Sequence, residues 1–359
     1  MNLRRPGALL LVVSLAGMAG MVGALALAPA TADAVRYPFG GAGDDDQRAV
    51  DLLERSAAAM QHTAYSGTRM LSTWGRDSAT TVLVDVQHVP GQGTTMSMRG
   101  GGAARGTATF LAWGAEGSAQ ASTFGVQAFD LLTDGYAVTL GGSDSVAGRP
   151  SRVVEVSRAG AVVARLWVDD RSGLLLRREV YDGRGRLVRE GTFIDVDVSA
   201  PAFLAHLPPT APQQDANDVD VGSRRAVVAD GWACPRQVGT MRLLDIEVLD
   251  RSGAMHLAYS DGLTRMSVFE QSGSLAPRAV RGLDRVRVRG ETVHVREGIP
   301  TYAMWHEDGV VFTAVTDGTL ASVAPVVRGD VPGSEADDGF WARVGGGFSR
   351  LGAWATPLL

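Results

Sequence analysis

The sequence contains no lysine and a single cysteine, Cys234. All 34 residues counted as lysine or arginine are therefore arginine, which we interpret as the mark of a GC-rich genome. One cysteine excludes a disulfide within the chain. Because free cysteine is usually found in protein interiors, we expect Cys234 to be buried.

Concentrated charge of one sign is also missing. The formal net charge is −5, and neither sign forms a long run. A nucleic-acid groove requires a concentrated basic face, so we predict no nucleic-acid partner. With 45% hydrophobic and 20% charged residues, the composition is that of a globular protein, and 359 residues are enough for two domains and an export segment.

Motifs that carry catalysis are absent from the sequence. It has no G-x-S-x-G nucleophile elbow, no Walker A loop and no G-x-G-x-x-G, and its six histidines include no H-x-x-x-H pair. Cys234 lies in an apolar, turn-like stretch that disfavours a thiolate. The Asp residues stand mostly at expected turns, where their side chains bind their own backbone. We therefore predict a protein that is not an enzyme and has no metal site and no cofactor.

The first 34 residues have the pattern of an export segment. Arg4 and Arg5 precede an uncharged apolar run from Ala8 to Ala28, and small residues that fit A-x-A cleavage follow. The run is also long enough to span a bilayer, since about 18–20 apolar residues suffice. A cleaved signal peptide and a retained membrane anchor both remain open. In either case we expect the chain to be exported, to the outer face of the cytoplasmic membrane or the extracytoplasmic space.

A first domain is expected over residues 47–205, after a Gly-rich acidic connector at 35–46. Apolar residues at helical spacing predict a helix over residues 47–61, and a second, short helix is expected at 126–132. Alternating patterns bounded by Gly, Pro, Asp or Ser predict strands at 64–74, 81–89, 94–99, 107–113, 151–158, 162–168, 174–181 and 187–198. Consecutive strands with short turns indicate a meandering antiparallel sheet.

A Pro-, Asp- and Gln-rich stretch at 206–222 predicts a linker, because it has little to bury. A smaller β-rich domain follows at 223–328. Its strands are expected at 242–249, 254–258, 265–271, 286–288, 291–296, 302–306 and 310–316, and a closing helix at 320–327. Residues 329–359 form an acidic segment and an amphipathic aromatic tail, which could pack on its own domain, on a partner or at a membrane interface.

Two ordered stretches resemble signatures of the RseB/MucB family of sigma-E factor regulatory proteins. The first runs from Ala147-Gly148-Arg149-Pro150 through Arg165-Leu166-Trp167-Val168-Asp169 to Gly173-Leu174-Leu175-Leu176-Arg177. The second is Tyr259-Ser260-Asp261-Gly262-Leu263 followed by Ser267-Val268-Phe269. Gram-negative members have an aromatic, Arg-containing stretch before the Arg-Leu-Trp strand. Residues 159–164 have neither feature, which with the absence of lysine indicates an actinobacterial-type member.

The resemblance implies a mainly β fold with flanking helices. The N-terminal domain would be a curved antiparallel half-barrel similar to the LolA/LppX lipoprotein carriers, followed by a smaller β-rich C-terminal domain. It also implies that the chain binds the extracytoplasmic domain of a membrane anti-sigma factor, and so regulates an extracytoplasmic sigma factor, with a lipid-like signal releasing it. The alternative is an exported carrier of lipid or lipoprotein.

Candidate ligand-contacting residues lie on the strands expected before residue 114. An apolar half-barrel can hold acyl chains, since burial contributes about 0.8 kcal/mol per CH₂. The candidates for lining such a cavity are Trp74, Met96, Met98, Phe110 and Trp113. The same residues could instead fill an ordinary core.

A second set of candidates comes from the two signatures, whose residues could present a partner surface or have a structural role. Trp167 and Arg165 are two apart on a strand and so share a face. The signature candidates are Arg149, Arg165, Trp167, Tyr259, Asp261, Gly262 and Phe269.

Overall fold

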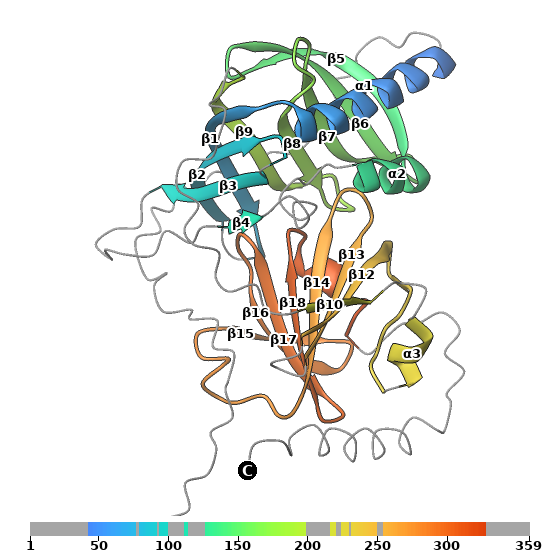
Figure 1. The fold of residues 1–359 in the computed structure, drawn as a ribbon, viewed down its shortest axis with the longest axis vertical. Coiled ribbons are helices and arrows are strands. Elements are labelled where there is room, and N and C mark those ends of the chain that lie inside the picture. Colours follow the sequence, from blue (N-terminus) through green and yellow to red (C-terminus); the bar gives the residue numbers. More distant parts are fainter. Residues whose placement is uncertain are drawn as a thin grey trace, which may run out of the picture.

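The chain folds into two β-rich domains, each built on one antiparallel sheet (Figure 1). The structure is a computed structural model, and it describes residues 42–76, 79–91, 93–99, 111–113, 126–198, 216–219, 224–229, 231–249 and 254–327. The expected export segment, most of the connector and the C-terminal tail lie outside these residues. Among the helices that the structure describes, none has the length and apolar character needed to cross a bilayer.

The N-terminal domain contains a nine-stranded sheet of order β4-β3-β2-β1-β9-β8-β7-β6-β5. Its strands are β1 (Tyr65–Trp74), β2 (Ala79–Val89), β3 (Gly93–Arg99), β4 (Leu111–Trp113), β5 (Ala137–Val146), β6 (Arg149–Arg158), β7 (Ala161–Asp169), β8 (Leu175–Tyr181) and β9 (Leu187–Asp197). All neighbours are antiparallel, and β9 returns to pair with β1. The sheet does not close into a barrel, so the expected curved half-barrel with flanking helices is confirmed.

Two helices lie across this sheet (Figure 1). They are α1 (Ala42–His62), which packs on β5, β7 and α2, and α2 (Val126–Gly135). The expected apolar face of α1 is present, because Leu53, Ala57 and Met60 are buried in the core. The helix begins at Ala42, within the stretch that we expected to be a connector, and thus five residues before the predicted start.

Strand β5 was not predicted, because its sequence contains the strand-breaking run Gly141-Gly142-Ser143-Asp144. The structure shows a register shift between Leu140 and Ser143, which accommodates this run as an irregularity in the pairing with β6. A Cβ placed on Gly141 would lie 3.2 Å from Cβ of Val153. The glycine therefore allows two strands to approach each other closely. The local sequence pattern does not indicate this role.

The turn between β8 and β9 is longer than the two-residue hairpin that its Asp182-Gly183 pair could form. It spans residues 182–186, and the positive φ lies at Gly185 rather than at Gly183. The Asp182 carboxylate accepts hydrogen bonds from the amides of Arg184 and Arg186. The side chain thus holds a longer loop together, and the left-handed residue comes later.

The C-terminal domain contains a second antiparallel sheet, of order β10-β12-β13-β14-β18-β17-β16-β15, with β11 pairing on β12. Its strands are β10 (Ala216–Val219), β11 (Gln237–Val238), β12 (Met241–Leu249), β13 (Ala254–Ser260), β14 (Arg265–Ser272), β15 (Asp284–Val288), β16 (Glu291–Arg296), β17 (Thr301–Glu307) and β18 (Val310–Thr316). Two short helices, α3 (Arg224–Ala229) and α4 (Leu320–Val323), accompany it. The strand predicted over 310–316 coincides with β18.

The predicted linker at 206–222 needs a correction at its end. Residues 216–219 form β10, which pairs with β12 and so is part of the C-terminal sheet. The polar residues Asn217 and Asp218 led us to predict a linker here, but an edge strand can also contain polar residues. The predicted closing helix at 320–327 is also shorter than expected, because α4 ends at Val323.

Each domain has its own hydrophobic core. The N-terminal core is formed by residues of α1, α2 and the sheet, and the C-terminal core is centred on Trp305, Tyr259 and Met255. Cys234 is 3% exposed in the C-terminal core, so the predicted burial of this thiol is confirmed. Burial also raises the pKa of Cys234 to about 11, which leaves the thiol protonated at neutral pH.

Gly67 offers a test of how tightly β1 and β9 pack. A Cβ built on Gly67 would lie 2.3 Å from the backbone oxygen of Asp195. We expect Gly67→Ala to reduce the free energy of unfolding by about 1–3 kcal/mol, since the backbone must shift to admit the methyl group. Gly183→Ala is the matched control, because nothing lies within 4 Å of its Cβ position. Urea denaturation of both variants checks the prediction, and equal stabilities would contradict it.

Candidate functional site at the junction of the two domains

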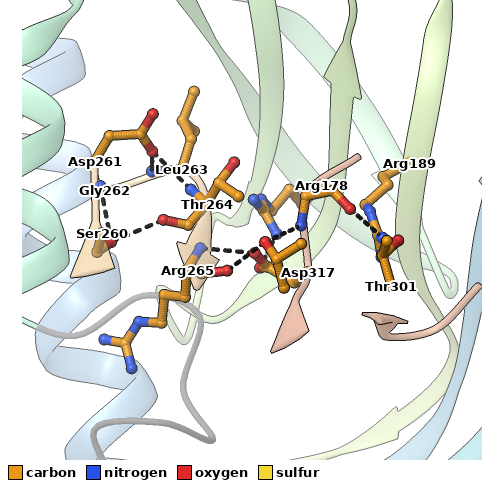
Figure 2. Close-up of polar contacts among 12 residues, drawn as sticks. Arg178, Arg189, Ser260, Asp261, Gly262, Leu263, Thr264, Arg265, Thr301 and Asp317 are labelled. Atoms are coloured by element: carbon orange, nitrogen blue, oxygen red, sulfur yellow. Dashed lines mark hydrogen bonds and ion pairs between the residues drawn. The ribbon is translucent and has the colours of Figure 1, made fainter. Parts of the chain in front are cut away.

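The second signature forms a tight turn between β13 and β14, which we call the signature turn (Ser260 to Thr264; Figure 2). Oδ1 of Asp261 accepts hydrogen bonds from the amides of Leu263 (3.1 Å) and Thr264 (2.8 Å). The Ser260 hydroxyl accepts the amide of Gly262, whose φ is 87°. Glycine suits this left-handed position because it has no Cβ.

The other oxygen of Asp261 links the two domains. Oδ2 accepts hydrogen bonds from the hydroxyl groups of Tyr136 (2.8 Å) and Thr240 (2.7 Å). Tyr136 directly follows α2 of the N-terminal domain, whereas Thr240 directly precedes β12. Burial and the nearby Asp261 carboxylate raise the pKa of Tyr136, so its phenol remains a donor. Asp261 therefore shapes its own turn and also fastens it to the N-terminal domain.

Leu263 makes the apolar part of this link. It belongs to the C-terminal chain, yet it is 4% exposed within the hydrophobic core of the N-terminal domain. In Figure 2 its side chain extends from the signature turn toward the elements of that domain. Burying a leucine contributes about 1.5–3 kcal/mol, so this side chain is a substantial part of the junction.

An arginine-rich polar cluster lies beside the signature turn (Figure 2). Arg178 of β8 forms an ion pair of 3.5 Å with Asp317 of the C-terminal domain. The other oxygen of Asp317 accepts the backbone amide of Arg265 at 2.7 Å. Arg189 of β9 donates to the hydroxyl of Thr301 at 2.9 Å and to two backbone oxygens, those of residues 298 and 318.

Positive charge exceeds negative charge in this cluster. Burial lowers the pKa of Arg189 to about 10, an effect that Arg178 adds to and that Asp317 and Glu297 oppose. Burial lowers the pKa of Arg265 as well. The Nε atoms of Arg189 and Arg265 are buried without a hydrogen-bond partner. Unpaired buried donors cost free energy, so the arginine cluster stabilises the junction less effectively than the hydrogen bonds of Asp261 do.

Two contacts border the junction. Arg242 forms an exposed ion pair of 3.0 Å with Asp134, near the end of α2. At the β1–β2 turn, the amide of Arg76 donates to the Glu297 carboxylate at 3.0 Å, and a Cβ on Gly75 would lie 2.6 Å from the same oxygen. The surface between the domains is thus largely polar, a composition typical of domain interfaces that permit relative movement.

The first signature lies within the N-terminal domain, away from the junction. Arg149 donates two hydrogen bonds to Asp169, of 3.0 and 2.8 Å, and the amide and hydroxyl of Ser172 donate to the same carboxylate. These bonds lower the pKa of Asp169 despite its burial. They tie the start of β6 to the end of β7 and hold the β7–β8 turn.

Trp167 and Arg165 both contact neighbouring strands. The Trp167 indole donates to Asp144 at 2.8 Å, and the Arg177 guanidinium lies 4.6 Å from the centre of a Trp167 ring. Arg165 pairs with Glu155 at 2.9 Å. These contacts stabilise the sheet and leave little of either side chain for a partner.

The remaining signature residues lie in the C-terminal domain. Tyr259 is 2% exposed and donates to the backbone oxygen of Pro235 at 3.0 Å. Phe269 is partly buried and stacks on His256, with ring centres 4.5 Å apart. Of the signature candidates, Asp261 and Gly262 are therefore the ones that the structure places at the junction.

The expected ligand-contacting residues are only partly described. Met96 on β3 packs against the N-terminal core, and Trp74 is partly buried at the end of β1. Met96 pairs with Val86, which pairs with Gly67, so Trp74 lies seven residues further along β1. That is about 23 Å along a strand, so these two do not meet. The side chains of Met98 and Trp113, and the whole of Phe110, lie outside what the structure describes.

The junction residues that sequence reasoning missed are Tyr136, Leu263, Arg178 and Arg189. Leu263 is part of the second signature but was not a candidate, because a leucine after a turn does not indicate a binding or catalytic role. Arg178 and Arg189 lie on strands that were predicted from an alternating pattern of residues, and that pattern does not mark an arginine as functional. Within the described ranges, no group of three or more His, Cys, Asp or Glu side chains is placed to hold a metal ion.

Comparison with known proteins gives one family match. Residues 115–216 match the model of the MucB/RseB N-terminal domain. The matched region includes α2 and strands β5 to β9, and so contains the first signature. No curated protein matches the sequence.

Similar solved structures include two of MucB. A crystal structure of MucB is 18% identical, with a TM-score of 0.44, and covers 78% of this chain and 96% of its own. The complex of MucA and MucB from Pseudomonas aeruginosa is also 18% identical, with a TM-score of 0.38, and covers 77% and 95%. A LolA superfamily protein from Nitrosomonas europaea is 10% identical, with a TM-score of 0.18, and covers 75% and 91%.

Proposed function

Because residues 115–216 match the model of the MucB/RseB N-terminal domain, we propose that this chain is an extracytoplasmic regulatory protein that binds the exterior domain of a membrane anti-sigma factor. Such binding would control the release of an extracytoplasmic sigma factor. The observation that carries the proposal is the family match over residues 115–216. A solved complex of MucB with the periplasmic part of MucA is an example of this kind of pairing in a similar protein.

The junction supports a role in regulated binding. The two domains are joined by a few specific contacts, chiefly Asp261 with Tyr136 and the buried Leu263, together with an arginine cluster that carries unsatisfied donors. A polar junction of this kind permits the domains to change their relative position. A partner or ligand that prefers one arrangement would shift the population toward it.

Direct binding to the anti-sigma partner tests the proposal. The exported chain is immobilised and exposed to the exterior domain of the anti-sigma factor encoded beside an extracytoplasmic sigma factor in the same genome. We expect saturable binding, and none to the exterior domain of an anti-sigma factor from an unrelated system. Failure to bind any anti-sigma exterior domain of the host would contradict the proposal.

Lipid sensing, and the alternative of a lipid or lipoprotein carrier, is favoured by the open half-barrel of the N-terminal domain. A sheet that does not close leaves an apolar face on which acyl chains can lie. Native mass spectrometry of the exported chain should then show a co-purifying acyl ligand. A ligand-free spectrum from the native host, under conditions that retain lipids on a carrier control, would count against this function.

A further inference from the structure

A cavity of about 320 Å³ lies at the opposite edge of the N-terminal sheet from β4. It is open to solvent on one side and lined by residues of α1, β5, β6, the end of β7 and the turn that joins β7 to β8. Its volume is at the small end of the range typical of small-molecule sites. The side chains that matter for its chemistry are Arg48, Leu52, Arg55, Leu140, Arg152 and Arg171.

Three separate elements bring arginines to this cavity. Arg48 and Arg55 are seven residues apart on α1, so they lie about two turns apart on one face, with Leu52 between them. Arg152 comes from β6 and Arg171 from the β7–β8 turn. All four arginines are exposed, whereas Leu52 is 8% exposed and belongs to the core. The cavity therefore has a cationic rim and an apolar floor.

The carboxylates at the cavity do not balance this charge. Asp169 already accepts two hydrogen bonds from Arg149 and two from Ser172, and its side chain is fully buried. That leaves Asp170 as the other carboxylate in the lining. Within the part of the chain that the structure describes, Arg152 and Arg171 form no ion pair with a carboxylate. The guanidinium groups of Arg152 and Arg171 thus outnumber the one uncommitted carboxylate of the lining, that of Asp170.

The walls of the cavity are held in place without a ligand. Gly173, with a φ of 75°, allows the β7–β8 turn to approach α1 so closely that a Cβ would lie 3.2 Å from Cβ of Ala59. The Arg149–Asp169 pair fixes the base of the same turn. The arginines therefore extend from backbones whose relative position is already set, which reduces the ordering cost of binding.

We propose that this cavity binds a phosphate-type oxyanion carried on a small organic group. Guanidinium groups match the geometry of phosphate oxygens in paired hydrogen bonds, and convergent like charges are stabilised by an anion between them. Leu52 and Leu140 would contact the carbon skeleton of the ligand. The inference does not depend on the anti-sigma partner, because the cavity lies away from the domain junction.

The test compares a cavity variant with a matched control. Isothermal titration of glycerol 3-phosphate into the exported chain, at constant ionic strength, measures soluble binding. Flotation with phosphatidylcholine vesicles, with and without phosphatidylglycerol, measures a lipid headgroup. The cavity variant is Arg55→Gln with Arg152→Gln, and the control is Arg281→Gln with Arg285→Gln, two exposed arginines of the C-terminal domain. Circular dichroism verifies that both fold.

We expect the cavity variant to lose at least tenfold in affinity for each arginine removed, since a hydrogen bond to a charged group is worth about that factor. Loss for glycerol phosphate identifies a soluble ligand class, and loss on vesicles alone identifies a lipid headgroup. The proposal is overturned if neither probe binds the native chain, or if the control variant weakens binding equally. Anti-sigma binding, measured on the same proteins, should be unchanged, so the two proposals can fail separately.

Discussion

Replacing Leu263 by alanine should separate the unfolding of the two domains. This side chain comes from the C-terminal domain but is buried in the N-terminal core. Truncating a buried leucine typically costs about 2–5 kcal/mol, through lost burial and the cavity that remains. Here that cost falls on the contact between the domains. Thermal unfolding followed by circular dichroism should change from a joint transition to two, with the N-terminal domain losing the stabilisation that the signature turn provides.

A leucine with the same burial but a different location serves as the control. Leu257 is 1% exposed in the C-terminal core. Leu257→Ala should destabilise the C-terminal domain by a similar amount while leaving the N-terminal transition in place. If Leu263→Ala unfolds as the native chain does, the junction is held by its polar contacts. In that case Asp261→Ala, which removes the acceptor for Tyr136, should separate the transitions instead.

Replacing Glu270 by glutamine should stabilise the protein at neutral pH. Glu270 of β14 is 3% exposed, and its carboxylate accepts the amide of Ala233 at 3.0 Å. Burial raises its pKa from 4.5 to about 8, an effect that this hydrogen bond only partly offsets. At pH 8.5 the native chain must bury a charged carboxylate, whereas glutamine keeps the acceptor without the charge. We expect a gain of about 1–3 kcal/mol in the free energy of unfolding, measured by urea denaturation.

The pH dependence of this effect has a definite sign. Because the folded pKa lies above the unfolded one, the folded state binds the proton more tightly. The contribution of Glu270 to stability is therefore present below about pH 4.5 and is lost as the pH rises toward 8. The advantage of Glu270→Gln should accordingly be absent at pH 4 and largest above pH 8.

Glu247 provides a control of opposite sign. Its hydrogen bond with His256 of 2.9 Å lowers its pKa, so ionised Glu247 stabilises the fold. Glu247→Gln should therefore reduce stability at neutral pH, and less so in acid. An advantage for Glu270→Gln that is equal at pH 4 and pH 8.5 would show that its cause is packing rather than charge.

The strands could be predicted where local pattern and local structure agree. The boundaries of β18 coincide with the prediction, because apolar alternation and turn residues bracket the same seven residues. β5 was missed, because Gly141, which disfavours a strand in isolation, is also the residue that lets the strand approach β6. β10 was missed for a related reason, since a four-residue edge strand with Asn217 and Asp218 at its centre resembles a linker in sequence.

The residues of the candidate site were likewise predicted only in part. Asp261 and Gly262 were candidates because they belong to the second signature, and the turn that they form is local: a carboxylate accepts the amides that follow it, and glycine takes the positive φ. Their connection to Tyr136 spans 125 residues, and no pattern within either segment indicates it. The arginine cavity could not be predicted from the sequence either, because its arginines come from three elements that approach one another only in the folded chain.

The sequence by itself determined the fold class, the family resemblance and the burial of Cys234. Each of these depends on interactions between residues close together in the chain or on the period of apolar side chains. Only the tertiary structure decided that Leu263 completes the core of the other domain, and that arginines from α1, β6 and the β7–β8 turn converge. Such contacts depend on how whole elements are placed, which is set by the summed packing of both cores and not by any one segment.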